Sequence, residues 1–329
     1  MRAIQIKSFG GPDVLESIER TTPTPGEGEI LVRLRAIGVN FAETLARQAK
    51  YVVTPELPAV LGSEGAGEIA ALGPRVSGLS IGQRVAAPLF AAGSITGAYA
   101  EYAVLPAALA VPLPDDISFE IAAAVQVQGL TALYLIRQAD PKGKNILINA
   151  AAGGVGSLLV QMAGKAGAKT IVAAASSHEK LEFAKKRGAD AGVNYTKADW
   201  LDELRRATGS AGPDVIYESV GGKVLADSLA ALAPLGRIVI YGALNIHSFA
   251  LGAPELLGMI FKNQSMTGFA FAPLLTPQAL GRDLRHLFDL IAAGGLDVNI
   301  GGAFPLERAA EAHRALENRT TMGKLLLLA

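Results

Sequence analysis

The 329-residue chain contains no cysteine. This absence excludes disulfide bonds, thiolate metal ligands and cysteine nucleophiles. Net charge is also absent, because 30 lysines and arginines balance 30 aspartates and glutamates. No lysine- or arginine-rich block breaks that balance locally, so we expect neither nucleic acid nor an anionic membrane surface as a partner.

Long apolar runs are missing as well. The opening residues, MRAIQIKSFGG, lack the apolar core of a secretory signal. The most apolar helical candidate, residues 121–136, is interrupted by Gln126 and Gln128 and is short for a membrane span. We therefore expect no membrane association and a cytoplasmic location.

The length of the chain and the order of its apolar patterns predict two domains of an α/β protein. Residues 1–117 contain short alternating apolar runs separated by proline and glycine, which indicates a small irregular β-barrel. In residues 118–262, strands alternate with helices, which predicts a doubly wound parallel sheet. We expect residues 263–329 to add an edge strand and a helix to this sheet and then to return to the barrel.

The clearest local motif is NILINAAAGGVGSLLVQMAGKAG, residues 145–167, which indicates a buried strand, a tight turn and an amphipathic helix. Ala151, Gly153 and Gly156 have the spacing of the dinucleotide fingerprint, with alanine in the first position. Glycine clusters between a strand and a helix also occur where they only permit close packing. The alternation of strands and helices that follows favours the dinucleotide interpretation.

The turn itself is predicted to hold phosphate. A helix N-terminus offers unpaired N–H groups and a positive dipole end, so a pyrophosphate can bind there without a dedicated cation. We expect the cofactor to contact four consecutive residues, Ala152, Gly153, Gly154 and Val155.

The end of the second strand indicates which dinucleotide binds. An NAD-selective site usually has a carboxylate about 20 residues beyond the glycines. Here Ser176 and Ser177 stand at that turn, followed by Lys180 in the next helix. Hydroxyls and an ammonium would hold a 2′-phosphate that a carboxylate would repel, which predicts NADPH, although Lys180 also fits an ordinary exposed lysine. Tyr195, ending the third strand, can add a phenolic hydrogen bond.

Five ordered motifs resemble the zinc-free quinone oxidoreductases of the medium-chain dehydrogenase/reductase superfamily, whose relatives include zeta-crystallin. They are AIGVNFAETLAR (36–47), LPAVLGSEGAGEI (57–69), GAYAEYAVLP (97–106), QGLTALYLI (128–136) and AAAGGVG (150–156). The resemblance covers nearly the whole chain. It implies a GroES-like catalytic barrel interrupted by a Rossmann domain, with NADPH in the cleft between them.

The resemblance also indicates whether the chain binds a metal ion. In the zinc-dependent alcohol dehydrogenase branch, cysteine and histidine ligands occupy the motifs around Ile37 and a GHE-like triplet, which here reads Gly62-Ser63-Glu64. Glu64 alone cannot replace three ligands, and the four-cysteine lobe is missing, so no metal is expected. The histidines lie far apart and are interpreted as surface or packing residues: His178, His247, His286 and His313.

By their positions in the family motif, Asn40 and Tyr51 would lie beside the substrate and the nicotinamide. The Asn40 amide can donate to a carbonyl oxygen, or it can cap the helix predicted over residues 41–48. Tyr51 can donate through its hydroxyl or stack, or it is an ordinary half-buried aromatic residue. Leu45 stands where some relatives carry tyrosine. The resemblance puts Thr131 near the nicotinamide ribose, although its hydroxyl can also bond within its own helix.

Three further positions follow from the resemblance. Gly242, after the last core strand, matches a second glycine turn along the cofactor. Arg319 matches a family arginine that reaches the cofactor, although a solvated position fits equally well. Arg47 is interpreted as a surface ion-pair partner in preference to a phosphate ligand.

An edge strand at residues 265–271 is expected to pair with a second subunit, which gives a homodimer, unless the following helix protects that edge.

These residues lead to a functional hypothesis. NADPH delivers hydride to a quinone, and protein hydrogen bonds stabilise the charge that develops on the substrate oxygen, so that zinc is not required. Reduction of an α,β-unsaturated carbonyl (alkenal or enoyl) is the alternative from the same chemistry. A non-catalytic, crystallin-like NADPH-binding protein is the alternative from another class.

Overall fold

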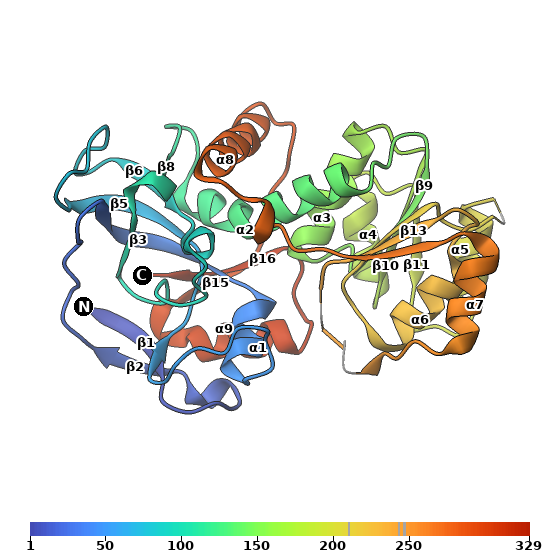
Figure 1. The fold of residues 1–329 in the computed structure, drawn as a ribbon, viewed down its shortest axis with the longest axis horizontal. Coiled ribbons are helices and arrows are strands. Elements are labelled where there is room, and N and C mark those ends of the chain that lie inside the picture. The colour runs from blue at the N-terminus through green and yellow to red at the C-terminus, as the bar shows by residue number, and fades with distance from the viewer. Residues whose placement is uncertain (210, 243, 246–247) are drawn as a thin grey trace. The chain divides into compact units, whose positions relative to one another are not determined.

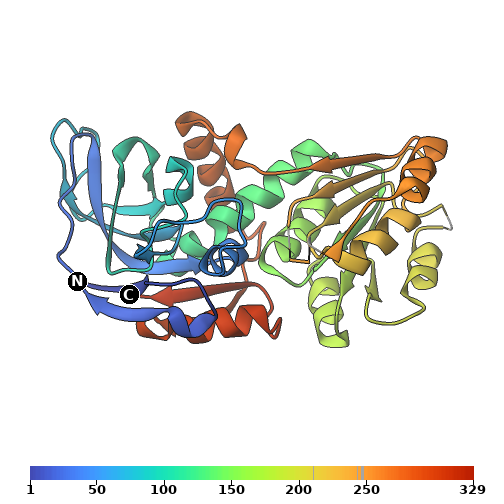
Figure 2. The same ribbon diagram turned by 60° about the horizontal axis from the view of Figure 1, so that its bottom comes forward.

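A computed structural model of the chain describes residues 1–209, 211–242, 244–245 and 248–329. The chain forms two compact units, which we treat separately. The first unit contains residues 1–130 and 272–329, and the second contains residues 131–271. The N-terminal and C-terminal ends both belong to the first unit and lie near each other in both views (Figure 1 and Figure 2).

The first unit is built mainly from β-strands. Its strands are β1 (Arg2–Ile6), β2 (Glu16–Glu19), β3 (Glu29–Val39), β4 (Ala59–Val60), β5 (Gly65–Leu72), β6 (Arg84–Ala87), β7 (Tyr102–Pro106), β8 (Val111–Pro112), β15 (Ile300–Pro305) and β16 (Lys324–Leu328). One sheet has the order β15-β16-β3-β5-β6-β8, with β7 also paired to β3, and a second has the order β2-β1-β4. The C-terminal strand β16 pairs antiparallel with β3, so segments from opposite ends of the chain form one sheet.

Four α-helices and several short 3-10 turns accompany these strands. The α-helices are α1 (Phe41–Arg47), α2 (Phe119–Gln138), α8 (Pro277–Ala292) and α9 (Ala309–Glu317). The 3-10 turns are η1 (Pro12–Val14), η2 (Leu89–Ala92), η3 (Ala107–Leu109), η5 (Ala272–Leu274) and η6 (Leu306–Arg308). At the start of α2, the Ser118 hydroxyl accepts a hydrogen bond from Ile121 N at 3.2 Å and so caps the helix.

Helix α2 belongs partly to each unit. Its Gln126 side chain donates to Gly65 O at 2.8 Å, which ties the first half of the helix to the barrel strands. The division between the units falls within the helix, between Leu130 and Thr131. Among the described residues, α2 is the one helix long and apolar enough to span a membrane, but 61% of that stretch is buried inside the protein, as in a core helix.

The second unit is a six-stranded parallel sheet of the doubly wound Rossmann type. Its elements are β9 (Asn145–Asn149), α3 (Gly154–Lys165), β10 (Thr170–Ala175), α4 (His178–Lys185), β11 (Ala191–Asn194), α5 (Trp200–Ala207), β12 (Val215–Glu218), α6 (Gly222–Ala231), β13 (Arg237–Ile240), α7 (Ala253–Lys262) and β14 (Ser265–Gly268). The strand order is β11-β10-β9-β12-β13-β14. The direction of winding reverses between β9 and β12, which is where such sheets bind dinucleotides. The predicted fold class is confirmed.

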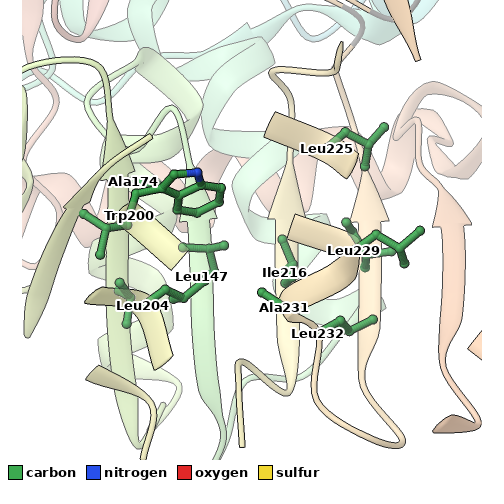
Figure 3. Close-up of a cluster of buried hydrophobic side chains, with 12 residues drawn as sticks. Leu147, Ala174, Trp200, Leu204, Ile216, Leu225, Leu229, Ala231 and Leu232 are labelled. Carbon is green, nitrogen blue, oxygen red and sulfur yellow. The ribbon is translucent and has the colours of Figure 1, made fainter. Parts of the chain in front are cut away.

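One face of this sheet carries a continuous apolar core (Figure 3). Alternate strand residues such as Leu147 and Ile216 point to this face, where Trp200 and Leu204 of α5 and Leu229 of α6 pack on them. Burying each such side chain contributes about 1.5–3 kcal/mol. The core holds the strands in register and so fixes the edge at which their carboxyl ends meet.

Helices α3 and α4 lie on the opposite face of the same sheet. Gly164 of α3 faces Ile171, and Leu181 of α4 faces Gly192. Crossovers of one hand place α3 and α4 on one face and α5 and α6 on the other, with the glycine turn between β9 and α3 at the point of reversal.

Candidate functional site

The glycine turn between β9 and α3 has the geometry of a phosphate cradle. A Cβ atom added at Gly156 would lie 2.4 Å from Ala150 O, so only glycine allows α3 to approach the strand this closely. At Gly153 the same test gives 3.3 Å to Ala150 O, a close contact beside the backbone. Ala151 N donates to Ala174 O at 3.1 Å, which anchors the turn to the end of β10.

The N-terminus of α3 supplies donors to this cradle. Gly153 is the N-cap residue, and the first intrahelical bond runs from Ser157 N to Gly153 O at 2.9 Å. The N–H groups of Gly154 and Val155 precede that bond, at the positive end of the helix dipole. Ala152 is buried in the turn. The turn therefore fits the pyrophosphate of a dinucleotide.

The residues predicted for the 2′-phosphate gather at the neighbouring strand ends. Ala175 pairs with Asn194, so Ser176 and Tyr195 emerge side by side from β10 and β11. Ser177 is the N-cap residue of α4, and its hydroxyl oxygen accepts from Lys180 N at 3.4 Å. The Ser177 hydroxyl can still donate to a phosphate. Like the glycine turn, all four residues lie at the carboxyl edge of the sheet.

Two further loops complete this edge. A Cβ atom at Gly242 would lie 2.6 Å from the Ser219 Cβ, so the loops after β12 and β13 approach each other closely at that glycine. The loop after β12 is fixed by Glu218, whose Oε1 accepts from Val220 N and Gly221 N at 2.6 and 2.7 Å.

A buried network missed by the sequence analysis supports these loops. Asn149, at the end of β9, donates to the Glu218 carboxyl and to Ser228 Oγ of α6. Burial raises the pKa of Glu218. The available signal was a carboxylate and an amide at the ends of otherwise apolar strands, since such groups are buried only when they are hydrogen-bonded.

In the first unit, Asn40 has a structural and a polar role together. It is the N-cap residue of α1, and its backbone N donates to Glu43 Oε2 at 2.9 Å. Its side chain turns to other partners: Nδ2 donates to Glu64 Oε1 at 2.8 Å, and Oδ1 accepts from Lys324 Nζ at 2.6 Å. Asn40 therefore occupies the cap position through its backbone N–H, while its side-chain amide belongs to a buried polar cluster.

A buried ionic cluster surrounds Asn40. Lys324 Nζ lies 2.6 Å from Glu64 Oε1, and both side chains are almost completely buried. The other Glu64 oxygen accepts from Val127 N of α2 at 2.7 Å. Ser63 Oγ donates to Glu43 Oε1 at 2.6 Å, and burial raises the pKa of Glu43. Lys324 and Glu43 were not predicted as site residues from the sequence; the available signal for Lys324 was a charged residue directly beside an apolar run, KLLLL.

Tyr51 lies on the loop after α1 and is half-buried. Burial first, and then the negative charge of Glu43, raise its pKa. The phenol therefore stays protonated at neutral pH and can donate a hydrogen bond. Leu45, also half-buried, supplies no polar group on the same helix.

The surface position expected for Arg47 is wrong. Arg47 is fully buried because the inner face of α1 packs against α9. Its guanidinium pairs with Glu317, donates to Gly10 O at 3.1 Å and contacts His313 Nδ1 at 3.3 Å. Because arginine only donates, His313 Nδ1 accepts, and its protonated Nε2 donates to the Tyr99 hydroxyl at 2.9 Å. Burial, followed by the Arg47 charge, lowers the pKa of His313 to about 3.

The remaining predicted positions are less closely grouped. Thr131 is nearly buried on α2, in the second unit. Arg319 is exposed after α9 in the first unit, with a φ of 55°. His178 and His286 are exposed and His313 is buried, whereas His247 lies outside the described residues. In the part of the chain that the structure describes, no group of three or more histidine and carboxylate residues could hold a metal ion.

Comparisons with known proteins agree with this architecture. The profile of the alcohol dehydrogenase GroES-like domain matches residues 26–115, and the profile described as zinc-binding dehydrogenase matches residues 154–301. A quinone oxidoreductase from Pseudomonas aeruginosa is 38% identical over 99% of both chains. A 2-haloacrylate reductase from a Burkholderia species is 33% identical over 99% of this chain and 98% of its own length.

A solved structure extends the comparison to three dimensions. The crystal structure of Escherichia coli quinone oxidoreductase complexed with NADPH superposes with a TM-score of 0.90, at 34% identity and with complete coverage of both chains. Similarity of this extent, together with the Rossmann strand order and the GroES-like unit, establishes the family. The chain belongs to the quinone oxidoreductase family of the medium-chain dehydrogenase/reductase superfamily.

Proposed function

We propose that this protein is an NADPH-dependent reductase that transfers hydride to a quinone without the help of zinc. The observation that carries the proposal is the carboxyl edge of the second unit. There a glycine cradle for pyrophosphate lies beside strand ends that present two hydroxyls, a phenol and an ammonium where an NAD-selective site has a carboxylate. The E. coli relative of the same fold, crystallised with NADPH, supports this choice of cofactor.

In this proposal, each part of the edge binds one part of NADPH. The N-terminus of α3 holds the pyrophosphate through Gly154 and Val155, and the close approach at Gly242 leaves room for the cofactor along the loops. Ser176, Ser177, Lys180 and Tyr195 hold the 2′-phosphate. Thr131 and Arg319 are proposed as further cofactor contacts. The nicotinamide supplies hydride when bound, and the chain supplies orientation and hydrogen bonds.

Asn40 and Tyr51 are proposed to act on the substrate. A quinone or enone spreads the negative charge of reduction onto its oxygen, where an N–H or O–H donor stabilises it. Asn40 Nδ2 and the protonated Tyr51 hydroxyl are donors of this kind. A hydrogen-bond donor then takes the role that a metal ion has in alcohol oxidation. The absence of cysteine from the chain supports this view.

A second candidate is the reduction of an α,β-unsaturated carbonyl. The similarity to a 2-haloacrylate reductase over nearly the whole chain favours it. Both reactions use the same cofactor and the same kind of donor, so the shape of the substrate pocket decides between them. Leu45, which adds an apolar surface to α1 in place of a hydroxyl, is one position where that shape is set.

Turnover measurements test both candidates. Purified protein is given NADPH with a panel of quinones, alkenals and 2-substituted acrylates, and oxidation of the cofactor is followed by absorbance. We expect the fastest turnover with a quinone and unchanged rates after exhaustive chelation. Faster turnover of an enone supports the second candidate. Loss of activity with removal of stoichiometric zinc refutes zinc independence, and absence of turnover with every compound favours a non-catalytic NADPH-binding protein.

The proposed assembly is a cytoplasmic homodimer. Strand β14 is the last in the sheet order, and beside it the helix α7 buries none of its residues. Exposed apolar side chains of α7 include Ile260 and Phe261, which are 68% and 84% exposed. An apolar patch next to an open strand edge is typical of an interface, and a second copy of the chain offers the matching edge by two-fold symmetry.

A further inference from the structure

Lys324, Glu64 and Asn40 form a closed triangle of buried polar groups in the first unit. Lys324 Nζ lies 2.6 Å from Asn40 Oδ1 and 2.6 Å from Glu64 Oε1. Asn40 Nδ2 donates to the same Glu64 oxygen at 2.8 Å. Because Lys324 and Glu64 are 1% and 0% exposed, water does not compete for these contacts.

This triangle permits one orientation of the Asn40 amide. An asparagine amide has a donor end, Nδ2, and an acceptor end, Oδ1. After a half-turn, Nδ2 would face the Lys324 ammonium, which only donates, and Oδ1 would face the Glu64 carboxylate, which only accepts. Both contacts of the reversed amide are repulsive, and in a buried site no solvent relieves them. The ion pair therefore fixes the direction of the amide.

One amide proton of Asn40 remains weakly held. Glu64 accepts one of the two Nδ2 protons. The second faces Glu43 Oε1 at a distance of 3.4 Å from Nδ2, longer than the usual N–H···O range of about 2.7–3.2 Å. That Glu43 oxygen already accepts from Ser63 Oγ at 2.6 Å. A better acceptor, such as a substrate oxygen gaining negative charge, can take over this proton.

We propose that Lys324 is a positioning residue for the reduction. Together with Glu64 it holds the Asn40 amide so that its second N–H is directed away from the ammonium and is ready for the substrate oxygen. The ammonium also balances the Glu64 charge, which would otherwise repel the developing oxyanion. This inference rests on the proposed function, because it assigns the substrate oxygen as the acceptor.

The double variant Lys324→Met/Glu64→Gln tests the proposal. It removes both buried charges while keeping side-chain length, so no buried charge is left without a partner. The new glutamine amide can turn to match either orientation of Asn40, so the orientation is no longer fixed. We expect kcat to fall about 10- to 100-fold, the loss that follows when a reacting group is misplaced. The dissociation constant for NADPH and the thermal unfolding midpoint should stay close to the wild-type values.

A spectroscopic signature separates positioning from a merely structural role. The ¹⁵N side-chain amide resonance of Asn40, assigned by its absence in Asn40→Ala, should shift or split in the double variant. A matched control is Lys7→Met/Glu16→Gln, which removes an exposed ion pair of 2.9 Å in the same unit. The control should change neither kcat nor the Asn40 resonance.

Two results would overturn the proposal. One is a folded double variant with wild-type kcat, and the other is an unmoved Asn40 resonance in that variant. If the double variant does not fold, Lys324→Gln serves, because a glutamine amide can offer Asn40 either a donor or an acceptor and the Glu64 carboxyl can take up a proton. In that variant kcat should fall and the Asn40 resonance should shift, and wild-type values of both would overturn the proposal. Failure of the proposed function looks different, because the wild-type protein then reduces no quinone or enone.

Discussion

At the scale of single residues, a substitution at Asn40 distinguishes stabilisation of the transition state from capping of the helix. Because the cap uses the backbone N–H of Asn40, alanine can keep that bond to Glu43 while losing the side-chain amide. Asn40→Ala should lower kcat by about 10²- to 10³-fold, the range for losing one oxyanion donor. The Michaelis constant for NADPH should barely change. Losses of activity and thermal stability in equal proportion would indicate that the residue serves mainly the helix.

Lys180 is the residue proposed to set the preference between the two nicotinamide cofactors. A charge-assisted hydrogen bond to a 2′-phosphate contributes about 1.5–3 kcal/mol, or roughly 10- to 150-fold in affinity. Lys180→Ala should therefore raise the Michaelis constant for NADPH by about that range and leave the constant for NADH unchanged. Lys185→Ala, on the same helix and paired with Glu182, is the matched control. Parallel losses with both cofactors would remove Lys180 from the phosphate site.

His313 should make stability depend on pH. Burial lowers its pKa from 6.5 to about 3, so the unfolded chain binds a proton between these values that the folded chain does not. The stability contributed by the neutral ring is complete above pH 6.5 and is lost as the pH falls, by about 1.4 kcal/mol per pH unit. Denaturant unfolding of wild type and His313→Gln from pH 7 to 5 measures this. Equal slopes for the two proteins would contradict the assignment.

At the scale of elements, the contact between α3 and β9 depends on one glycine. In Gly156→Ala the new methyl group would lie 2.4 Å from Ala150 O, so the helix must move away from the turn. We expect weaker NADPH binding and a lower unfolding midpoint. Gly164→Ala in the same helix is the control, because its methyl group meets only Ile171 Cδ1 at 3.6 Å, and it should keep NADPH affinity. Calorimetry of NADPH binding to both variants checks this, and equal affinities would refute it.

The hydrogen bonds of the edge strand β14 decide which substitution can test the proposed dimer. Ser265 N donates to Gly236 O and Phe269 N to Ile240 O, so the odd-numbered N–H groups of β14 point inward to β13. A proline at Thr267 would remove a hydrogen bond from β14 to β13. It would therefore disturb the sheet itself and would not act on the open edge alone. A substitution on α7 tests the interface without this disturbance.

At the scale of the whole molecule, the proposed dimer depends on the apolar surface of α7. Phe261→Glu places a charge at the most exposed apolar position of the helix and should shift the protein toward monomer at micromolar concentration. Val52→Glu, at an 89% exposed position of the first unit, is the control and should not change the mass. Analytical ultracentrifugation measures the mass of both variants. A wild-type monomer under these conditions would contradict the proposed assembly.

Several features of the fold could be predicted because they depend on neighbours along the chain. The order of strands and helices after the glycine turn predicted a second strand following the helix, and the structure has it as β10, Thr170–Ala175. The edge strand was expected over residues 265–271 but is shorter, Ser265–Gly268, since pairing with β13 sets its length. Arg47 was misplaced because its burial depends on α9, which is distant in sequence.

The sequence by itself determined the two kinds of domain, the glycine turn and the lack of a carboxylate after the second strand, because each follows from residue spacing and type within one strand–turn–helix unit. Only the tertiary structure decided the polar cluster of the first unit. Lys324 reaches Asn40 from 284 residues away because β16 pairs with β3, and Glu64 joins them from the turn before β5. A side-chain hydrogen bond leaves no periodic signal in sequence, so these partners become visible only when the strands are assembled.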